Sequence, residues 1–503
     1  MPLPRRCEWP SSEHSIEFAY DVLRNQDRSG ELLDQTRLIT VPVVNPDGFN
    51  ISREAQQSGV VWTYSTFDYE MKRKNCRPMG QFVGAWTCLN SSLGAYAGVD
   101  PNRNYGGLWG APGAGVTQPD STYRGPGPFS EPEVQNIREL QSTRAITNLI
   151  SNHTFSELVL RPPGVAATGA APDEPLLDDL GADMAEHNGY ANVPGYALYD
   201  TSGTTEDWTY WTAGALSYTF EIGNLGFHPP FNNGVVDEYL GRGQASGSGA
   251  GGNREAYYSM LARTALGEEH AVLAAQDLPA GAELEITKTI QNETAPVIVE
   301  DDGDPVAPPI PFTDTLTYTA KADAGGDLEW HVNPSTRPWI DGRYGREATG
   351  DPQPPIAMPN PPGIPRENVR YPAGAYESFT FEAGGAGVDN GSFNVHIEWG
   401  DANTDWDVYV IGPDGSPVTS SASFGDTDED AFLRDPEPGT YTVHVVNYDL
   451  GDTDDWFGGE ITFGPAIAPV PPSGVEQWTL TCNGTTSEVE VDRGEVKDID
   501  GAC

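Results

Sequence analysis

The stretch Leu216-Ser-Tyr-Thr-Phe-Glu-Ile222 alternates apolar and polar side chains, which is the pattern of a β-strand. Two apolar runs, Arg37-Leu-Ile-Thr-Val-Pro-Val-Val44 and Ala145-Ile-Thr-Asn-Leu-Ile150, predict further buried strands. A turn, Asn45-Pro46-Asp47-Gly48, ends the first of them. Helices are predicted at 11–25, 131–142, 173–188 and 254–274. Strands interleaved with helices indicate an α/β domain around a largely buried sheet.

After residue 275 the helical periodicity disappears and short alternating segments take its place. The segments 393–399, 406–410 and 441–446, with turns between them, predict an all-β sandwich. The stretch 349–368 holds seven prolines, so it is neither a helix interior nor a central strand. We therefore expect three parts, with the boundaries 1–275, 276–475 and a C-terminal tail 476–503.

The chain is strongly acidic, with 28 Lys plus Arg against 74 Asp plus Glu and a net charge of −46. This charge excludes electrostatic binding to nucleic acid or to an anionic membrane. Hydrophobic residues make up 37% of the chain, too many for an acidic disordered protein, and no apolar run is long enough to span a membrane. Because the acid is spread over the whole sequence, it is typical of a halophile's surface, where about 1 M salt shortens the Debye length to roughly 3 Å. An ordinary acidic secreted protein is the alternative.

The chain has five cysteines. Cys76 and Cys88 lie close together in the sequence, as do Cys482 and Cys503, so two local disulfides leave Cys7 single. Two such disulfides favour an extracellular protein. The alternative is five reduced thiols.

Five sequence motifs follow one another in a fixed order between residues 8 and 275. They are Val41-Pro-Val-Val-Asn-Pro-Asp-Gly48, Gly98-Val-Asp-Pro-Asn-Arg-Asn104, Tyr123-Arg-Gly-Pro-Gly-Pro-Phe-Ser-Glu131, Ser151-Asn-His153, and Tyr199-Asp-Thr-Ser-Gly-Thr-Thr-Glu-Asp-Trp208 followed by Tyr218-Thr-Phe-Glu221. In this order they resemble the zinc carboxypeptidase family, the carboxypeptidase A-like metallopeptidases. The resemblance implies a mixed, mostly parallel sheet flanked by helices, with the family's first strands missing, and an enzyme that hydrolyses the C-terminal peptide bond.

Two residues match ligands of the family's single catalytic Zn²⁺. His153 follows the predicted strand 145–150, and strand ends are where α/β sheets place ligands. Glu8 matches the glutamate of the family's His-x-x-Glu turn, but Arg5 stands where the histidine is expected. A cation cannot ligate zinc, so an inactive member that binds peptides or surfaces is the alternative function. An incomplete beginning of the chain explains the same departure.

A literal His-x-x-Glu does occur, at His14 and Glu17, inside the helix that follows. It is a second candidate for the metal ligands. If it is aligned with the family's His-x-x-Glu turn, however, every downstream motif is shifted from its matching position.

The resemblance also assigns the groups that act in catalysis. Glu221 ends an apolar strand, where an ionised carboxylate needs a partner or a role, and it matches the general base and acid. Arg73, within the cationic cluster 72–77, matches the arginine that stabilises the oxyanion, with a solvated loop patch as the alternative. Asp100 matches a residue that orients a zinc histidine.

A carboxypeptidase must bind a free C-terminal carboxylate, for which a guanidinium and neutral donors are suitable. Asn102 and Arg103 match the family's carboxylate clamp, and Tyr199 matches its capping tyrosine. Glu206 falls in the stretch that matches the specificity pocket, where a carboxylate favours C-terminal Lys or Arg. A pocket for neutral residues is the alternative, with the lining threonines at 204 and 205.

The C-terminal part resembles the small β-sandwich modules that follow secreted peptidase domains. Its clustered carboxylates suit Ca²⁺, although a solvated acidic surface is the alternative: Asp401, Asp405, Asp407, Asp426, Asp428, Asp430, Asp452, Asp454 and Asp455. We expect an extracellular monomer that acts on peptides or proteins with a free C-terminus and has no nucleic-acid partner.

Overall fold

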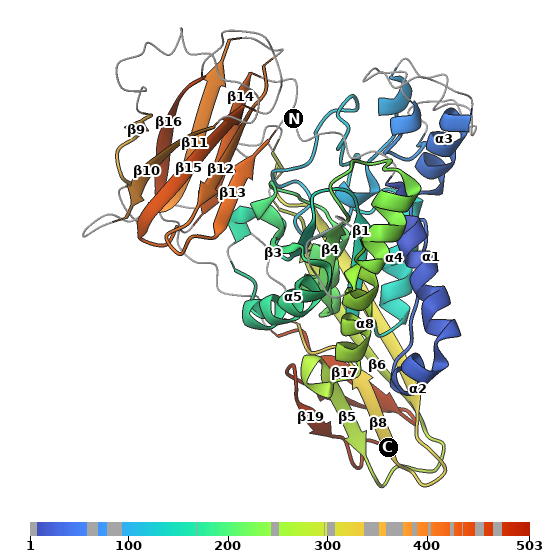
Figure 1. The fold of residues 1–503 in the computed structure, drawn as a ribbon. Helices are drawn as coiled ribbons and strands as arrows, with labels where there is room; N and C mark the ends of the chain where they lie inside the picture. The colour runs from blue at the N-terminus through green and yellow to red at the C-terminus, as the bar shows by residue number, and fades with distance from the viewer. Residues whose placement is uncertain are drawn as a thin grey trace.

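The structure is a computed structural model, and Figure 1 shows its fold. An α/β region lies in the centre, the orange β-sandwich lies at one end, and a second group of β-strands lies at the other end. The structure describes residues 8–57, 69–77, 93–168, 170–242, 251–295, 297–298, 307–336, 352–358, 376–384, 390–400, 404–422, 427–434, 436–447, 457–465 and 475–503.

The α/β region is built on a mixed sheet with the strand order β1-β4-β2-β3. β1 pairs with β4 in parallel and β2 with β3 in parallel, whereas β2 and β4 are antiparallel. All six residues of β4 are buried, as its apolar pattern predicts. The expected α/β fold with a mixed sheet is therefore confirmed. The strands are β1 (Asn148–His153), β2 (Leu158–Arg161), β3 (Ala191–Pro194) and β4 (Leu216–Glu221).

Helices pack around this sheet. The core between them includes Phe18 of α1, Leu180 of α5 and Tyr257 of α8 against Phe220 of β4. The helices are α1 (Trp9–Arg24), α2 (Gln26–Gln35), α3 (Pro46–Gln57), α4 (Pro132–Thr143), α5 (Glu174–Asn188), α6 (Thr205–Trp208), α7 (Asp237–Leu240) and α8 (Gly252–Thr264). The predictions for α1, α4 and α5 are correct to within two residues. No helix in the described part of the chain is long and apolar enough to cross a membrane.

Three local predictions are wrong. The predicted helix 254–274 ends at Thr264, because the chain turns there and enters β5 (Ala271–Ala275). The segment 37–44 is not a strand: it pairs with no other described segment, and Val41 and Val44 remain about 40% exposed. An apolar run becomes a strand only when a neighbour satisfies its backbone groups. The predicted turn at 45–48 is instead the start of α3.

The β-sandwich occupies residues 352–465 and confirms the expected all-β part. Its two sheets have the strand orders β10-β15-β12-β13 and β14-β11-β16-β9. The inner faces share one core that includes Phe393, Trp406 and Val443. The strands are β9 (Ile356–Ala357), β10 (Tyr376–Ala383), β11 (Asn390–Trp399), β12 (Trp406–Ile411), β13 (Pro417–Ser421), β14 (Asp428–Arg434), β15 (Gly439–Asn447) and β16 (Phe457–Pro465).

The strands at the opposite end of the molecule come from segments before and after the sandwich in the sequence. β17 pairs with β6, and β19 pairs with β5, so the segment 476–503 joins sheets that begin before the sandwich. The Cys482–Cys503 disulfide is present, as predicted. The division 1–275, 276–475 and 476–503 stays a prediction, and this pairing favours grouping the tail with residues 271–336. The strands are β5, β6 (Glu283–Glu293), β7 (Pro311–Lys321), β8 (Leu328–Val332), β17 (Trp478–Cys482), β18 (Thr485–Val489) and β19 (Val496–Asp498).

Candidate active site

The carboxyl ends of β1 and β4 place two of the predicted residues side by side. His153 is the last residue of β1 and Glu221 is the last residue of β4, and the parallel register sets them directly opposite each other. His153 is 9% exposed and Glu221 is fully buried. An edge where parallel strands end is the usual position for a ligand site in an α/β fold.

Glu8 reaches this edge from the start of α1. Pro10 in the first turn favours a helix start here, and the Glu8 Oε2 atom lies 2.9 Å from His153 Nδ1. The other ring nitrogen, Nε2, lies 3.0 Å from the Ser151 hydroxyl oxygen. A ring nitrogen and a carboxylate oxygen at this separation are donors that fit zinc. A catalytic zinc needs a third protein ligand, and Arg5, at the position of the missing histidine, lies outside the described residues, as does Cys7.

The second candidate pair, His14 and Glu17, does not form a metal site. The His14 ring is buried, its Nε2 lies 3.0 Å from the Val235 carbonyl oxygen, and burial lowers its pKa to about 4. Glu17, three residues further along α1, is exposed. In this structure the His14 ring is therefore bound to a backbone carbonyl oxygen rather than to a site shared with Glu17.

Arg73 and Asp100 form a buried ion pair. The Arg73 Nε donates to Asp100 Oδ2 at 2.7 Å, and a second guanidinium nitrogen contacts the same oxygen. Burial acts to raise the pKa of Asp100, but the charges of Arg73 and Arg103 hold this pKa below its ordinary value. The described partners of the Asp100 carboxylate are thus Arg73 and the Asn102 backbone N–H, and a contact with a zinc histidine stays a prediction.

The lysines beside Arg73 are buried rather than solvated, so the alternative of a solvated patch is wrong for them. Lys72 Nζ donates to the Ala95 carbonyl oxygen at 3.1 Å and also contacts that of Ala97. Lys74 Nζ donates to the carbonyl oxygens of Gln118 and Asp120 at 2.6 and 2.8 Å. Burial lowers the pKa of both lysines to about 7. These contacts fix the loop on either side of Arg73.

Asn102 and Arg103 have different environments. The Asn102 Oδ1 accepts from the Thr205 backbone N–H at 3.0 Å and from its hydroxyl at 3.1 Å. The Asn102 Nδ2 group makes no hydrogen bond to another described residue, so it is available to a ligand. Arg103 is fully buried and donates to the carbonyl oxygens of Gly113 and Asn102 at 2.8 and 2.7 Å. Thr205 was not predicted as a partner of Asn102, because the two are far apart in the sequence.

A cavity of about 1400 Å³ opens beside these residues. Five of the predicted site residues line it, whereas Arg103, Tyr199, Glu206 and Glu221 do not. The five are Glu8, Arg73, Asp100, Asn102 and His153. The segments 33–45 and 143–153 line the same cavity.

The remaining predicted residues do not line this cavity. Glu206 is buried at the start of α6, next to Asp207. Burial and then the charge of Glu206 raise the pKa of Asp207 well above its ordinary value. Tyr199 is half-buried and follows the short turn η5 (Gly195–Ala197).

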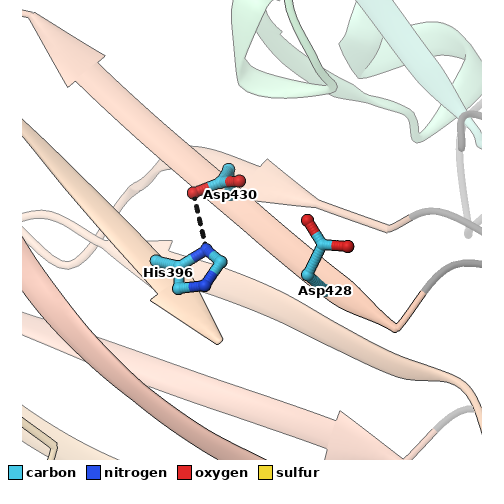
Figure 2. A group of neighbouring side chains, drawn as sticks. All are labelled: His396, Asp428 and Asp430. Atoms are coloured by element: carbon cyan, nitrogen blue, oxygen red, sulfur yellow. Dashed lines mark hydrogen bonds and ion pairs between the residues drawn. The ribbon is translucent and has the colours of Figure 1, made fainter. Parts of the chain in front are cut away.

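The carboxylates proposed for Ca²⁺ are only partly described. Asp401, Asp426, Asp452, Asp454 and Asp455 lie outside the described residues. Asp428 and Asp430 of β14 lie beside His396 of β11 on the outer face of the sandwich, and His396 Nδ1 lies 3.0 Å from Asp430 (Figure 2). Both carboxylates are exposed, so this group is explained by an ordinary surface ion pair.

Comparison with known proteins shows which family the α/β region resembles. The family model of the zinc carboxypeptidases matches residues 7–234. Carboxypeptidase A1 of Mus musculus is 31% identical over 231 residues, which cover 44% of this chain and 49% of that protein. A zinc carboxypeptidase of Saccharothrix mutabilis subsp. capreolus is 30% identical over 217 residues, covering 39% of this chain and 43% of that protein. This chain therefore spans about half the length of these curated relatives.

Among solved structures, bovine thrombin-activatable fibrinolysis inhibitor, in complex with tick carboxypeptidase inhibitor, is similar to 52% of this chain. The match covers 79% of that chain with 22% identity and a TM-score of 0.38. The family model assigns its match to residues 7–234, and the sequence relatives match a stretch of similar length. Residues 7–234 of this chain therefore belong to the zinc carboxypeptidase family, among its carboxypeptidase A-like members.

Proposed function

We propose that this protein is a metallocarboxypeptidase that releases C-terminal residues from peptides or proteins. The observation that carries the proposal is the cavity that brings together Glu8, His153, Arg73 and Asn102, from four separate segments of a zinc carboxypeptidase domain. These side chains supply two metal donors, a cation and a neutral hydrogen-bond donor, which are among the groups that the reaction requires.

Each group has a defined task in this proposal. His153 and Glu8 would hold the catalytic zinc, which when bound would acidify a water molecule and polarise the scissile carbonyl. Glu221, at the end of β4 opposite His153, takes a proton from the attacking water and delivers it to the leaving amine. Arg73 donates to the developing oxyanion, while Asn102 and Arg103 bind the free carboxylate and Tyr199 covers it.

The setting of the reaction is also part of the proposal. The Cys482–Cys503 disulfide supports an oxidising, extracellular location. We infer a monomer whose partners are peptide or protein substrates, and a Ca²⁺ ion in the C-terminal domain stays a prediction. Arg5 favours one alternative, a member without zinc that binds peptides or surfaces through the same cavity.

Zinc analysis tests the metal site. We expect the full chain, dialysed against excess zinc, to retain one equivalent that His153→Ala loses. His444→Ala is the matched control, because it removes an imidazole from β15 of the sandwich and leaves the cavity unchanged. Equal zinc content in the wild type and His153→Ala contradicts the assignment of His153, and absence of zinc from the wild type favours the binding protein.

Glu206 tests specificity. Glu206 is buried in the stretch that matches the family's specificity pocket, and a carboxylate in such a pocket attracts a basic side chain and rejects an acidic one. We therefore expect peptides ending in Arg to be preferred over those ending in Phe or Glu. Glu206→Gln is expected to reduce the preference for Arg by about 10-fold or more. Ratios of kcat/KM for the three peptides at high salt measure it. A preference for Phe that Glu206→Gln leaves unchanged places Glu206 outside the pocket.

Salt dependence tests the halophilic character. At low salt the carboxylates that give the net charge of −46 repel one another, whereas at about 1 M salt the Debye length is roughly 3 Å and the repulsion is screened. We therefore expect the melting temperature to rise steeply from dilute buffer to multimolar KCl. A melting temperature that is independent of KCl contradicts this expectation.

A further inference from the structure

The β-sandwich packs against the part of the α/β region that carries Tyr199 (Figure 1). β13 contacts η5, the short 3-10 helix that ends two residues before Tyr199. β14, the neighbouring strand in space, contacts a second short turn, η4 (Ala166–Thr168). The sandwich thus covers two turns of the α/β region at once.

The chain before Tyr199 is held by one polar and one apolar contact. The Ser420 hydroxyl of β13 lies 3.1 Å from the carbonyl oxygens of both Ala197 and Leu198, so it can donate to either. Tyr196 packs against the core of the sandwich, and this burial raises the pKa of its hydroxyl group. Contacts with the sandwich therefore hold the residues that directly precede Tyr199.

The chain after Tyr199 is held through η4. The Asp200 carboxylate accepts from the Ala166 backbone N–H at 2.8 Å, and Thr201 N–H donates to the Gly164 carbonyl oxygen at 2.6 Å. Ala166 begins the turn that β14 contacts. Tyr199 is thus the residue between two anchored ends, and both anchors lie under the sandwich.

We propose that the β-sandwich positions Tyr199 for substrate binding, with Ser420 as the positioning residue. Binding groups on loops depend on rigid support for their geometry, and the sandwich supplies this support from outside the α/β region. The inference rests on the role proposed for Tyr199, and it gives the C-terminal half of the chain a part in the same reaction.

Hydrogen exchange of the zinc-loaded full chain tests the contact without reference to activity. We expect Ser420→Ala to speed exchange in a peptide covering residues 195–201 by about two- to tenfold, as expected from the loss of one typical hydrogen bond. Ser420→Thr keeps the hydroxyl and is expected to restore slow exchange. Ser416→Ala is the matched control, since Ser416 is exposed in the turn before β13. Exchange in β1 and β4 is expected to stay unchanged in all three variants.

Kinetics on peptides with a free C-terminus test the link to Tyr199. Ser420→Ala is expected to raise KM by about two- to tenfold, the factor expected for the exchange rate, with little change in kcat. Ser420→Thr is expected to return KM to the wild-type value. Unchanged exchange in 195–201 overturns the contact, whether or not the chain is active. Faster exchange with unchanged KM and kcat overturns the role in substrate binding.

Discussion

Replacing Glu221 with Gln is expected to reduce kcat by about 100- to 10,000-fold, the range that a positioned proton-transfer group contributes. Gln has nearly the same size and keeps one acceptor oxygen, but its amide cannot take a proton from water. Glu221 is fully buried at the end of β4, opposite His153. A carboxylate on the protein surface therefore cannot take over its proton-transfer role in the variant. The measurement is peptide turnover by the zinc-loaded chain.

The control for this variant is the same change at Glu174. Glu174 pairs with Arg161 at the start of α5 and does not line the cavity, so Glu174→Gln is expected to keep wild-type turnover. Zinc content and melting temperature of Glu221→Gln are expected to match those of the wild type. Turnover that survives Glu221→Gln contradicts the role of Glu221 as general base.

Removing the Asp100 carboxylate is expected to lower the free energy of unfolding by about 3–5 kcal/mol, because Asp100→Ala leaves the buried Arg73 without its partner. The folded pKa of Asp100 lies below its unfolded value, so the contribution of the pair is fully present above the unfolded pKa. It is lost as the pH falls through the folded pKa. Urea unfolding of both proteins at neutral pH and constant high salt measures the difference.

Two comparisons separate this pair from ordinary surface charge. The double variant Arg73→Ala/Asp100→Ala is expected to recover part of the loss, because it removes the uncompensated charge. Glu283→Ala breaks the exposed Lys321–Glu283 pair and is expected to change stability little. Equal small losses for Asp100→Ala and Glu283→Ala contradict the buried pair.

The sequence predicts those elements whose pattern agrees with their surroundings. β4 alternates and is buried, and the helices α1 and α5 have an apolar face against the same core, while α4 buries Val134 and Ile137 in a separate cluster. The segment 37–44 is just as apolar, but a strand also needs a neighbouring strand, which only the tertiary structure can supply. This segment pairs with no described segment. Likewise β17 pairs with β6, although the whole sandwich lies between them in the sequence, and local pattern does not reveal such a long-range pairing.

The candidate site shows the same division. Resemblance to the family predicted Glu8 and His153 as metal ligands, and their 2.9 Å approach in the fold agrees with a common role. Side-chain direction was not predictable: Arg103 is directed to the Gly113 and Asn102 carbonyl oxygens, and Lys72 is buried although it lies in a cationic cluster. Such orientations depend on backbone acceptors from distant segments, which no sequence pattern specifies.

The most direct test of carboxypeptidase function is mass spectrometry of two matched peptides after incubation with the zinc-loaded chain at high salt. One peptide has a free C-terminal carboxylate and the other has an amide. We expect the free acid to lose its C-terminal residue and the amide to be a poor substrate, because the proposed clamp binds a carboxylate. Equal cleavage of the two peptides, or no shortening of either by a chain that holds zinc at His153, would contradict carboxypeptidase function.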